Sequence, residues 1–180
     1  GYLGENQVKV PNLAYRAKVS ASSSYHLVAQ KTRYSSSDYD YHYSPENAVD
    51  EDNGTLWKSV CSDMPQSLAI DLGTAKNIQR VMTQFEYPTF YYQYKIEVSV
   101  NNKEWTLFSD RTTNRQCGSP MIDDNNLKAR YVKLTVTATE ITGMPAAVWN
   151  IKVYDKLFDV PTYQNTPKTN EPGDVSTKSL

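Results

Sequence analysis

Residues 94–100 read Tyr-Lys-Ile-Glu-Val-Ser-Val, residues 101–102 are Asn-Asn, and residues 105–108 read Trp-Thr-Leu-Phe. Apolar and polar side chains alternate through the first of these segments, and a period of two residues is typical of a strand with one buried face. Two asparagines between such segments favour a tight turn. The stretch therefore predicts an antiparallel β-hairpin in which the even-numbered side chains from Tyr94 to Val100 face the core.

The same alternation recurs elsewhere, at residues 68–72, 81–86, 131–136 and 149–153, and residues 18–22 form a short polar strand candidate. Several short strands separated by turns, with almost no helical period, indicate an all-β fold. We expect an antiparallel sandwich, with a jelly roll as the favoured layout. The three tryptophans lie on strand-like patterns and are expected in the core; they are Trp57, Trp105 and Trp149.

Length and charge limit the class of protein. The chain has 180 residues, enough for one domain with a sizeable core. Nineteen basic against twenty acidic residues give a net charge of −1, which offers no broad field for a nucleic acid or an acidic membrane. No apolar run approaches the ~20 residues of a membrane span, and no targeting pattern opens the sequence.

Three segments are expected along the chain. Residues 1–11 read as an N-terminal arm or linker, and residues 12–155 contain all the predicted strands. Residues 156–180 are rich in Pro, Thr, Asn and Lys without apolar periodicity, which is typical of a linker or a disordered tail. Linkers on both sides favour a module of a larger, multidomain protein, and we expect the module to be monomeric.

Cys61 and Cys117 are the two cysteines of the chain. They are too few for a four-cysteine zinc site, and neither lies in a C-x-x-C pair. One structural disulfide and two buried thiols both remain open, and export of the protein would favour the bridge. If formed, the bridge would contribute roughly 4 kcal/mol by closing so long a loop.

Oxygen-bearing side chains are concentrated between Ser44 and Trp57. Asp50, Asp52 and Thr55 fall within a short segment that also contains proline and glycine. Carboxylates, hydroxyls and carbonyls at this density suit Ca²⁺, which takes six to eight oxygen ligands. An ordinary Asp/Asn/Gly turn is the alternative reading.

Tyrosine is unusually frequent, with 14 residues against 4 Phe and 3 Trp. Many lie in two segments expected to be irregular, residues 23–47 and 86–93, and long irregular loops are often functional. Aromatic rings stack on the C–H face of a pyranose, while polar side chains bind its hydroxyls. The alternative is that the tyrosines pack the loops. The candidate sugar-binding residues are Tyr25, His26, Arg33, Tyr34, Asp38, Tyr39, Tyr41, His42, Glu86, Tyr87 and Tyr91, with Tyr39, Tyr41 and Tyr91 as the first stacking candidates.

The sequence lacks the usual catalytic motifs. His26 and His42 have no nucleophile on a G-x-S-x-G turn near them, and no H-E-x-x-H, phosphate-binding or dinucleotide motif occurs. Asp123-Asp124 is expected in a polar turn. Arg111 and Arg115 are expected in an exposed basic turn, the alternative being that they face the ligand site from a third loop. We therefore expect no enzymatic activity from this chain.

Six short segments, in order, resemble the discoidin or coagulation factor five/eight type C domain. They are Asn12-Leu13-Ala14, Ala48-Val49-Asp50 with Thr55 and Trp57, residues 68–73, residues 94–99 with Trp105, residues 129–134 and residues 151–154. Within this family, the chain is most similar to the family 32 carbohydrate-binding modules of bacterial glycoside hydrolases. The resemblance implies a galactose-binding-domain-like jelly roll with a structural calcium ion and a ligand site among the loops at one end.

The resemblance also implies the calcium ligands. They are the Asn47 carbonyl, the Asp50 carboxylate, the Asp52 carbonyl, the hydroxyl and carbonyl of Thr55, the Trp149 carbonyl and the side chain of Asn150. The chain departs from the family pattern twice, with Glu51 in place of glycine and Asn150 in place of glutamate. An amide in place of a carboxylate removes one negative charge, which weakens calcium binding without abolishing it.

The function implied is that of a non-catalytic carbohydrate-binding module, with a mono- or oligosaccharide as its partner. It would tether a larger secreted bacterial enzyme to glycans from a secreted, periplasmic or cell-surface location. The alternative is a cell-surface adhesion module that binds protein or lipid. Relatives that bind membranes carry apolar loop tips, whereas this chain carries Tyr, Asp and Ser there, which suits a hydroxylated ligand better than a membrane.

Overall fold

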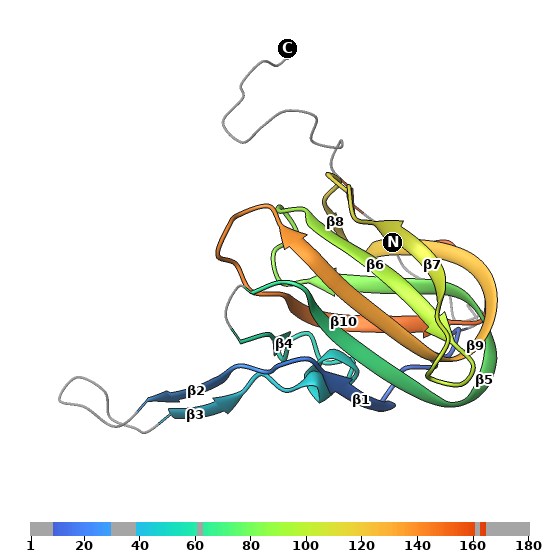
Figure 1. The fold of residues 1–180 in the computed structure, drawn as a ribbon, viewed down its shortest axis with the longest axis horizontal. Coiled ribbons are helices and arrows are strands. Elements are labelled where there is room, and N and C mark those ends of the chain that lie inside the picture. Colours follow the sequence, from blue (N-terminus) through green and yellow to red (C-terminus); the bar gives the residue numbers. More distant parts are fainter. Residues whose placement is uncertain (1–8, 30–38, 61–62, 161–162, 165–180) are drawn as a thin grey trace, which may run out of the picture.

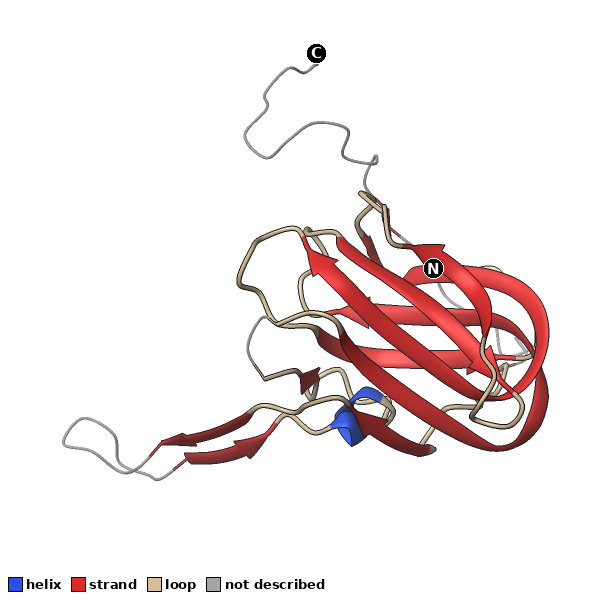
Figure 2. Cartoon of the chain, in the orientation of Figure 1, coloured by secondary structure: helices blue, strands red, loops and turns tan. Residues whose placement is uncertain are grey.

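The computed structural model describes residues 9–29, 39–60, 63–160 and 163–164, with the backbone alone at residues 29, 39, 163 and 164. Within these residues the chain is an antiparallel β-sandwich with one short 3₁₀ helix, η1 (Pro45–Ala48) (Figure 2). None of the described helical residues forms a segment with the length and apolarity of a membrane span. The strands are β1 (Lys18–Ala21), β2 (His26–Ala29), β3 (Tyr39–His42), β4 (Trp57–Lys58), β5 (Gln66–Phe85), β6 (Tyr92–Ser99), β7 (Thr106–Arg111), β8 (Gly118–Ser119), β9 (Met121–Thr139), β10 (Ala147–Tyr154) and β11 (Tyr163–Gln164).

Two long strands, β5 and β9, pass through both layers of the sandwich. Residues 66–71 of β5 pair with β1 and with residues 131–136 of β9. Residues 76–85 of β5 pair with β10 and with residues 121–129 of β9. Strands β6 and β7 extend the first layer, and β4 extends the second layer beyond β10. This two-layer arrangement confirms the predicted antiparallel jelly roll.

The strands change layers at a bend near Gly73. The pairing of β5 with β9 shifts register between Asp71 and Lys76, and Gly73 has a φ of 88°. Glycine adopts positive φ without the steric cost that a side chain would bring. Figure 1 shows β5 and β9 curving together at the right side of the molecule. The alternating segments 68–72 and 81–86, expected as separate strands, therefore belong to one bent strand.

The core lies between the two layers and contains the predicted apolar faces. Burying one such side chain contributes about 1.5–3 kcal/mol relative to leaving it in water. The largest fully buried side chains are Trp57, Tyr94, Leu68, Ile70, Ile78, Ile96, Leu134, Ile151, Val81, Val132, Val136 and Val148.

The hairpin predicted from residues 94–108 is confirmed as β6 and β7, with corrections at its turn. Val100 lies beyond the end of β6 and is 58% exposed, so the buried alternation ends at Val98. Trp105 is half-buried, with the Lys133 ammonium 4.1 Å from its ring centroid. Placing Trp105 in the core was therefore wrong, whereas Trp57 is fully buried as predicted.

Trp149 is also half-buried, because the pairing of β10 with β5 shifts between Val148 and Asn150. A β-bulge inserts a residue into one strand and breaks the alternation of its side chains. Asn150 therefore becomes a buried polar residue, and Trp149 turns away from the core. The core position predicted for Trp149 was wrong for this reason.

The sequence suggested that residues 23–47 are irregular throughout, and this prediction was wrong. They contain the antiparallel hairpin of β2 and β3, and the helix η1 follows. The hairpin projects from the body of the sandwich at the lower left of Figure 1. Successive side chains of the hairpin point to opposite faces, but neither face contributes a continuous row of apolar side chains to the core. The segment was therefore predicted to be a loop.

Asp123 and Asp124 lie on β9 and not in a polar turn. Asp123 is buried and accepts hydrogen bonds from the Tyr94 hydroxyl at 2.7 Å and from Arg111 Nε at 2.7 Å. Asp124 forms a two-bond pair with the Arg80 guanidinium at 2.7 and 2.8 Å. The predictions of a polar turn and of an exposed Arg111 were wrong, because long-range arginine–aspartate pairs hold these strands together. Burial raises the pKa of the Tyr94 hydroxyl well above its usual range, so this side chain remains a hydrogen-bond donor.

Both ends of the described chain contact the sandwich. Near the N-terminus, Leu13 N donates to Val153 O at 2.7 Å, and Asn12 Oδ1 accepts from Val153 N at 3.0 Å. Past residue 155, the ring of Phe158 packs edge-on against Tyr154 at 4.8 Å, and β11 pairs with β8. The predicted boundaries at residues 11 and 155 stay predictions, as does the pairing of the cysteines, since Cys61 lies outside the described residues.

Candidate functional site at the hairpin end of the sandwich

Several connections meet at one end of the sandwich. The segment after β4, the β5–β6 loop and the β9–β10 loop lie on the left of Figure 1, on the side from which the β2–β3 hairpin projects. Backbone hydrogen bonds join them: Ser59 N donates to Ala146 O at 2.8 Å, and Glu86 N donates to Ala147 O at 3.0 Å. The loops at this end are therefore fixed to one another through the start of β10.

Large apolar side chains are exposed on these connections. Tyr25 is 38% exposed, Tyr87 42%, Val60 43% and Ile141 43%. They come from segments far apart in sequence that the fold gathers at the same end. Exposed rings and aliphatic groups in one region are typical of a surface that contacts a ligand or a partner.

One face of the β2–β3 hairpin carries tyrosines. The ring of Tyr43 lies 5.8 Å from that of Tyr25 and 4.6 Å, edge-on, from that of Tyr41. Their backbones are joined as well, since Tyr43 N donates to Tyr25 O at 2.9 Å and Tyr25 N donates to Lys58 O at 2.8 Å. The base of the hairpin is therefore a fixed aromatic group beside β4.

An ion pair joins this group to the β5–β6 loop. Lys58 Nζ lies 3.2 Å from Glu86 Oε2, and both side chains are mostly buried, at 22% and 13% exposed. The same ammonium lies 5.1 Å from the centroid of the Tyr43 ring. Trp149 Nε1 donates to Glu86 O at 3.1 Å, which fixes the backbone of the glutamate. A charged donor and a charged acceptor are thus held beside tyrosine rings.

The β5–β6 loop presents one exposed and one buried tyrosine. Tyr87 packs against Phe90, with centroids 5.5 Å apart, and stays accessible. Tyr91 is only 9% exposed, and the Arg115 guanidinium lies 5.2 Å from its ring centroid. Burial raises the pKa of the neighbouring Tyr92 hydroxyl, which accepts a hydrogen bond from Tyr87 N at 3.3 Å. Of the predicted rings in this loop, Tyr87 is the one open to a ligand.

The other face of the hairpin carries His26, Asp40 and His42. Consecutive residues of a strand point to opposite faces, so these three side chains lie away from Tyr41 and Tyr43. His26 Nε2 is 2.5 Å from Asp40 Oδ1, and the two imidazole rings stack at 3.7 Å. The hydrogen bond from His26 lowers the pKa of the Asp40 carboxyl below its usual value.

Four of the predicted ligand-binding positions cannot be placed fully. Arg33, Tyr34 and Asp38 lie outside the described residues, and the backbone alone is described for Tyr39. Their assignment to the site stays a prediction.

The oxygen-rich loop after η1 lies at a separate position. Thr55 Oγ1 donates to Asp50 Oδ2 at 2.5 Å, and Asp50 Oδ1 accepts from Asp52 N at 2.9 Å. Thr55 Oγ1 is also 3.4 Å from Asp52 O. Glu51, where the family pattern has glycine, has a φ of 59°. The tight turn therefore forms despite the side chain and brings three predicted ligand residues together.

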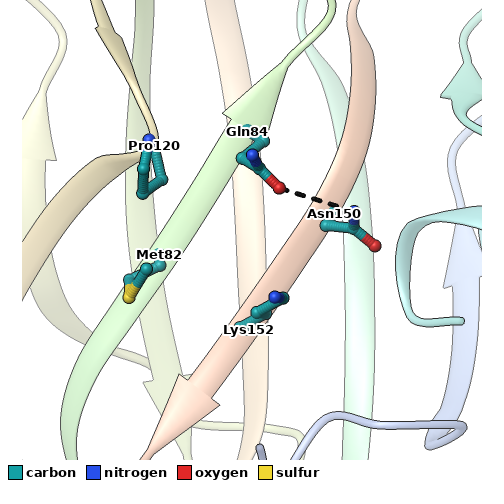
Figure 3. Close-up of a pocket in the computed structure, with 5 residues that line it drawn as sticks. All are labelled: Met82, Gln84, Pro120, Asn150 and Lys152. Carbon is teal, nitrogen blue, oxygen red and sulfur yellow. Dashed lines mark hydrogen bonds between the residues drawn. The ribbon is translucent and has the colours of Figure 1, made fainter. Parts of the chain in front are cut away.

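Asn150 connects β10 to this loop. Its Nδ2 donates to Asn53 Oδ1 at 2.8 Å and lies 3.4 Å from Gln84 Oε1, whereas its buried Oδ1 has no hydrogen-bond partner. Figure 3 shows the amide nitrogen facing Gln84 and the oxygen pointing away from it. An orphaned buried oxygen costs free energy unless something polar satisfies it. Like the oxygens of Asp50 and Thr55, it is the type of donor that Ca²⁺ prefers.

Two hollows elsewhere are weaker candidates for a sugar site. The pocket in Figure 3, lined by Met82, Gln84, Pro120, Asn150 and Lys152, has a volume of only about 80 Å³. Ligand pockets typically measure about 300–1,000 Å³. A second hollow of about 430 Å³ lies along β1, β5 and β9, but Tyr131, the one aromatic residue that lines it, already has the Arg130 guanidinium 5.0 Å from its ring centroid.

Lys58 is the residue that the sequence reasoning missed. It directly follows Trp57, and a two-residue strand leaves no periodicity to show which way its side chain points. The register of β4 with β10 places Lys58 opposite Ala147. The carbonyl of Ala147 accepts a hydrogen bond from the backbone N–H of Glu86. Its proximity to Glu86 is therefore a property of strand pairing, which local sequence does not carry.

No match was found among curated protein sequences. Chitosan-binding module 2 of a chitosanase/glucanase from Paenibacillus sp. IK-5, solved with chitotriose, is 25% identical with a TM-score of 0.61, over 79% of this chain and 99% of that one. A solved glycoside hydrolase is 28% identical with a TM-score of 0.70, over 83% of this chain but 33% of its own length.

A family 32 carbohydrate-binding module from Clostridium perfringens, solved with GlcNAc-α-1,4-galactose, has the same fold. It is 22% identical with a TM-score of 0.63, over 83% of this chain and 96% of that one. The structural neighbours thus include modules of bacterial glycoside hydrolases, as the sequence resemblance implied. The model of the F5/8 type C domain matches residues 29–150, more than half of the chain. The chain therefore belongs to the F5/8 type C domain family.

Proposed function

We propose that this chain is a carbohydrate-binding module that tethers a larger secreted or cell-surface protein to glycans. The observation that carries the proposal is two exposed tyrosine rings whose segments adjoin the Lys58–Glu86 ion pair: Tyr25 N donates to Lys58 O, and Tyr87 directly follows Glu86. The sugar complexes of the Paenibacillus and Clostridium modules support it. A glycoside hydrolase in the parent protein is the context that we propose, and we expect no hydrolytic activity from the chain itself.

The chemistry of the site suits a hydroxylated ring. Tyr25 and Tyr87 offer accessible faces against which the C–H groups of a pyranose can stack. Lys58 donates and Glu86 accepts hydrogen bonds, and their mutual pairing holds both in position before the ligand arrives. Tyr91, one of the first stacking candidates from the sequence, is too buried to serve without moving. We therefore place the stacking contacts on Tyr25 and Tyr87.

The expected affinity is weak. A monosaccharide has few non-hydrogen atoms, and an open surface buries only part of them. A Kd near 1 mM, about −4 kcal/mol, is therefore expected for the smallest ligand. A tethering module needs no more when several copies or a catalytic domain bind the same glycan.

A glycan array followed by NMR titration tests the proposal. The first soluble probes are chitotriose and GlcNAc-α-1,4-galactose, which the neighbouring modules bind. We expect the amide signals of Lys58, Glu86 and Tyr87 to shift on saturation. A folded protein that binds no glycan on the array, or shifts confined to the hollow around Arg130, would overturn the proposed site. Vesicle pelleting tests the adhesion alternative, because Val60 and Ile141 are exposed at the same end; binding to vesicles without binding to glycans would favour that function.

We also propose that the loop after η1 holds a structural calcium ion. Asp50, Thr55 and Asn150 would supply side-chain oxygens, and Asn47, Asp52, Thr55 and Trp149 would supply carbonyls. The ion would neutralise the Asp50 carboxylate and satisfy the orphaned Asn150 oxygen. It would thereby join the loop to β10 and stabilise the folded state.

A further inference from the structure

The two histidines of the chain lie side by side on one face of the hairpin. His26 on β2 and His42 on β3 are directly opposite each other in the strand register. Their rings stack with centroids 3.7 Å apart and planes 15° apart. Opposite positions on an antiparallel pair bring side chains within contact distance, so the backbone itself holds the imidazoles together.

Asp40 completes the group from the same face. Its Oδ1 is 2.5 Å from His26 Nε2 and 3.6 Å from His42 Nε2. Each imidazole therefore directs its Nε2 atom toward the same carboxylate oxygen. The side chains of His26, His42 and Asp40 are 44%, 61% and 67% exposed. The group is therefore open to solvent, and its side chains have room to rotate.

The three ligand atoms lie within 4.8 Å of one another. Nitrogen ligands about 2.05 Å from a tetrahedral Zn²⁺ stand about 3.3 Å apart. Side-chain rotations that move the ligand atoms by about an ångström therefore suffice to bring them to one ion. Exposed histidines can make such rotations. The ion would replace the hydrogen bond between His26 and Asp40.

The donor set points away from calcium. Imidazole nitrogen is a ligand for zinc, copper and nickel, whereas Ca²⁺ and Mg²⁺ prefer oxygen throughout. The hydrogen bond from His26 keeps the Asp40 carboxyl ionised, so it can contribute charge to a bound cation. Two nitrogens and one carboxylate are a common set of protein ligands for zinc, with the fourth position left to water or another ligand.

We propose that His26, Asp40 and His42 form a site for a divalent transition-metal cation, Zn²⁺ being the first choice, on the outer face of the β2–β3 hairpin. The site lies on the face opposite Tyr41 and Tyr43, and it is separate from the oxygen-rich loop. A bound ion would cross-link β2 to β3 and fix the projecting hairpin. Its open coordination position would accept a donor from a ligand or from another protein.

Isothermal titration with ZnCl₂ tests the site directly. The protein carries no affinity tag, is stripped with EDTA and is then dialysed into buffer with excess Ca²⁺, so that the oxygen-rich loop is not available to zinc. We expect one Zn²⁺ per chain with a Kd on the order of 10 µM, weaker than a closed four-ligand site. Titration with Mg²⁺ in place of Zn²⁺ should give no signal from this site.

Three variants assign the ligands. His26→Asn and His42→Asn should each weaken zinc binding by at least about tenfold, and Asp40→Asn should weaken it by a smaller factor. Asp110→Asn is the matched control, because Asp110 is also an exposed strand carboxylate, and its contacts to Thr112 can be kept by an amide. Circular dichroism confirms that each variant is folded.

Zinc-induced NMR shifts of both imidazole side chains provide a second readout. Absence of binding at millimolar Zn²⁺, or affinity unchanged in the His26→Asn/His42→Asn double variant, would overturn the proposal. The proposal would also be overturned if Asp110→Asn weakened zinc binding as strongly as Asp40→Asn does. Sugar binding is measured separately on the wild type, so failure of the zinc site leaves the proposed function standing.

Discussion

The hairpin face with His26 and the loop with Asp50 both gather possible metal ligands, yet they differ in every property that decides which cation binds. The loop offers oxygen donors and contacts the core strand β10, where the buried amide oxygen of Asn150 has no hydrogen-bond partner. The hairpin face offers two imidazoles and a carboxylate that are exposed to solvent. Donor type therefore selects the ion, while burial decides how much of the fold depends on it.

The largest effect is expected at the oxygen-rich loop. A ligand that binds only the folded state at 100 times its Kd contributes about 2.7 kcal/mol of stability. For a domain of this size, that corresponds to a rise in Tm of roughly 5 to 10 °C. Asp50→Asn should remove most of the calcium-dependent rise, because it takes the carboxylate from the donor set. Differential scanning calorimetry in Ca²⁺ and in EDTA measures both effects, and an identical wild-type Tm in the two buffers would contradict the calcium site.

Asn150→Asp adds a negative charge to the proposed calcium ligands, at the position where the family pattern has glutamate. The variant should bind calcium about tenfold more tightly, a gain of about 1.4 kcal/mol. In EDTA it should be less stable than wild type, because Asn53 and Gln84 would then face a buried carboxylate with their own oxygens. Calorimetry of calcium binding and melting in EDTA provide the two readouts. If the variant is equally stable with and without calcium, residue 150 is not a calcium ligand.

These two regions also show what the sequence can and cannot predict. Strands with a core-facing apolar row were predicted, because alternation in β6 and β9 follows directly from burial of one face. The β2–β3 hairpin was missed since β2, His-Leu-Val-Ala, has adjacent apolar residues, and β3, Tyr-Asp-Tyr-His, alternates polar side chains with tyrosines and not with aliphatic residues. Such strands leave no clear hydrophobic period, although Tyr39, Tyr41 and Tyr43 do recur at every second residue.

Other features depend on contacts between distant strands. The bulge that turns Trp149 outward is set by the pairing of β10 with β5, and the arginine partners of Asp123 and Asp124 come from β7 and β5. The position of Lys58 beside Glu86 follows from the same kind of pairing. Local sequence therefore named Glu86 and Tyr87 as site residues but could not supply the lysine that stands between them and the hairpin.

A smaller effect is expected for the sugar-stacking tyrosine. Tyr25→Ala should weaken binding of the best array ligand by roughly fivefold, since a ring contact contributes about 1 kcal/mol. The Tm should fall only slightly, because the ring is 38% exposed and its loss removes the contact with Tyr43 at 5.8 Å. Tyr15→Ala is the control, because Tyr15 is 46% exposed and lies outside the proposed site. Equal affinity for wild type and Tyr25→Ala, measured by NMR titration, would remove Tyr25 from the site.

The smallest effect is expected for Asp40→Asn, the same change as Asp50→Asn made on the exposed hairpin face. At pH 7 and without zinc, its Tm should lie within about 1 °C of wild type, because exposed ion pairs contribute little. The hydrogen bond from His26 lowers the pKa of Asp40 in the folded state, and the proximity of His42 lowers it further. A lowered pKa gives a contribution that is present above the unfolded-state value and is lost as the pH falls through the folded-state value. Any stability difference between wild type and Asp40→Asn should therefore persist from pH 7 to about pH 5 and be lost progressively below about pH 4, as the pH falls through the folded-state pKa of Asp40. Thermal melting across this range measures it. A large Tm difference at pH 7 that calcium abolishes would show that hairpin and loop are coupled, and the separation between the two regions would fail.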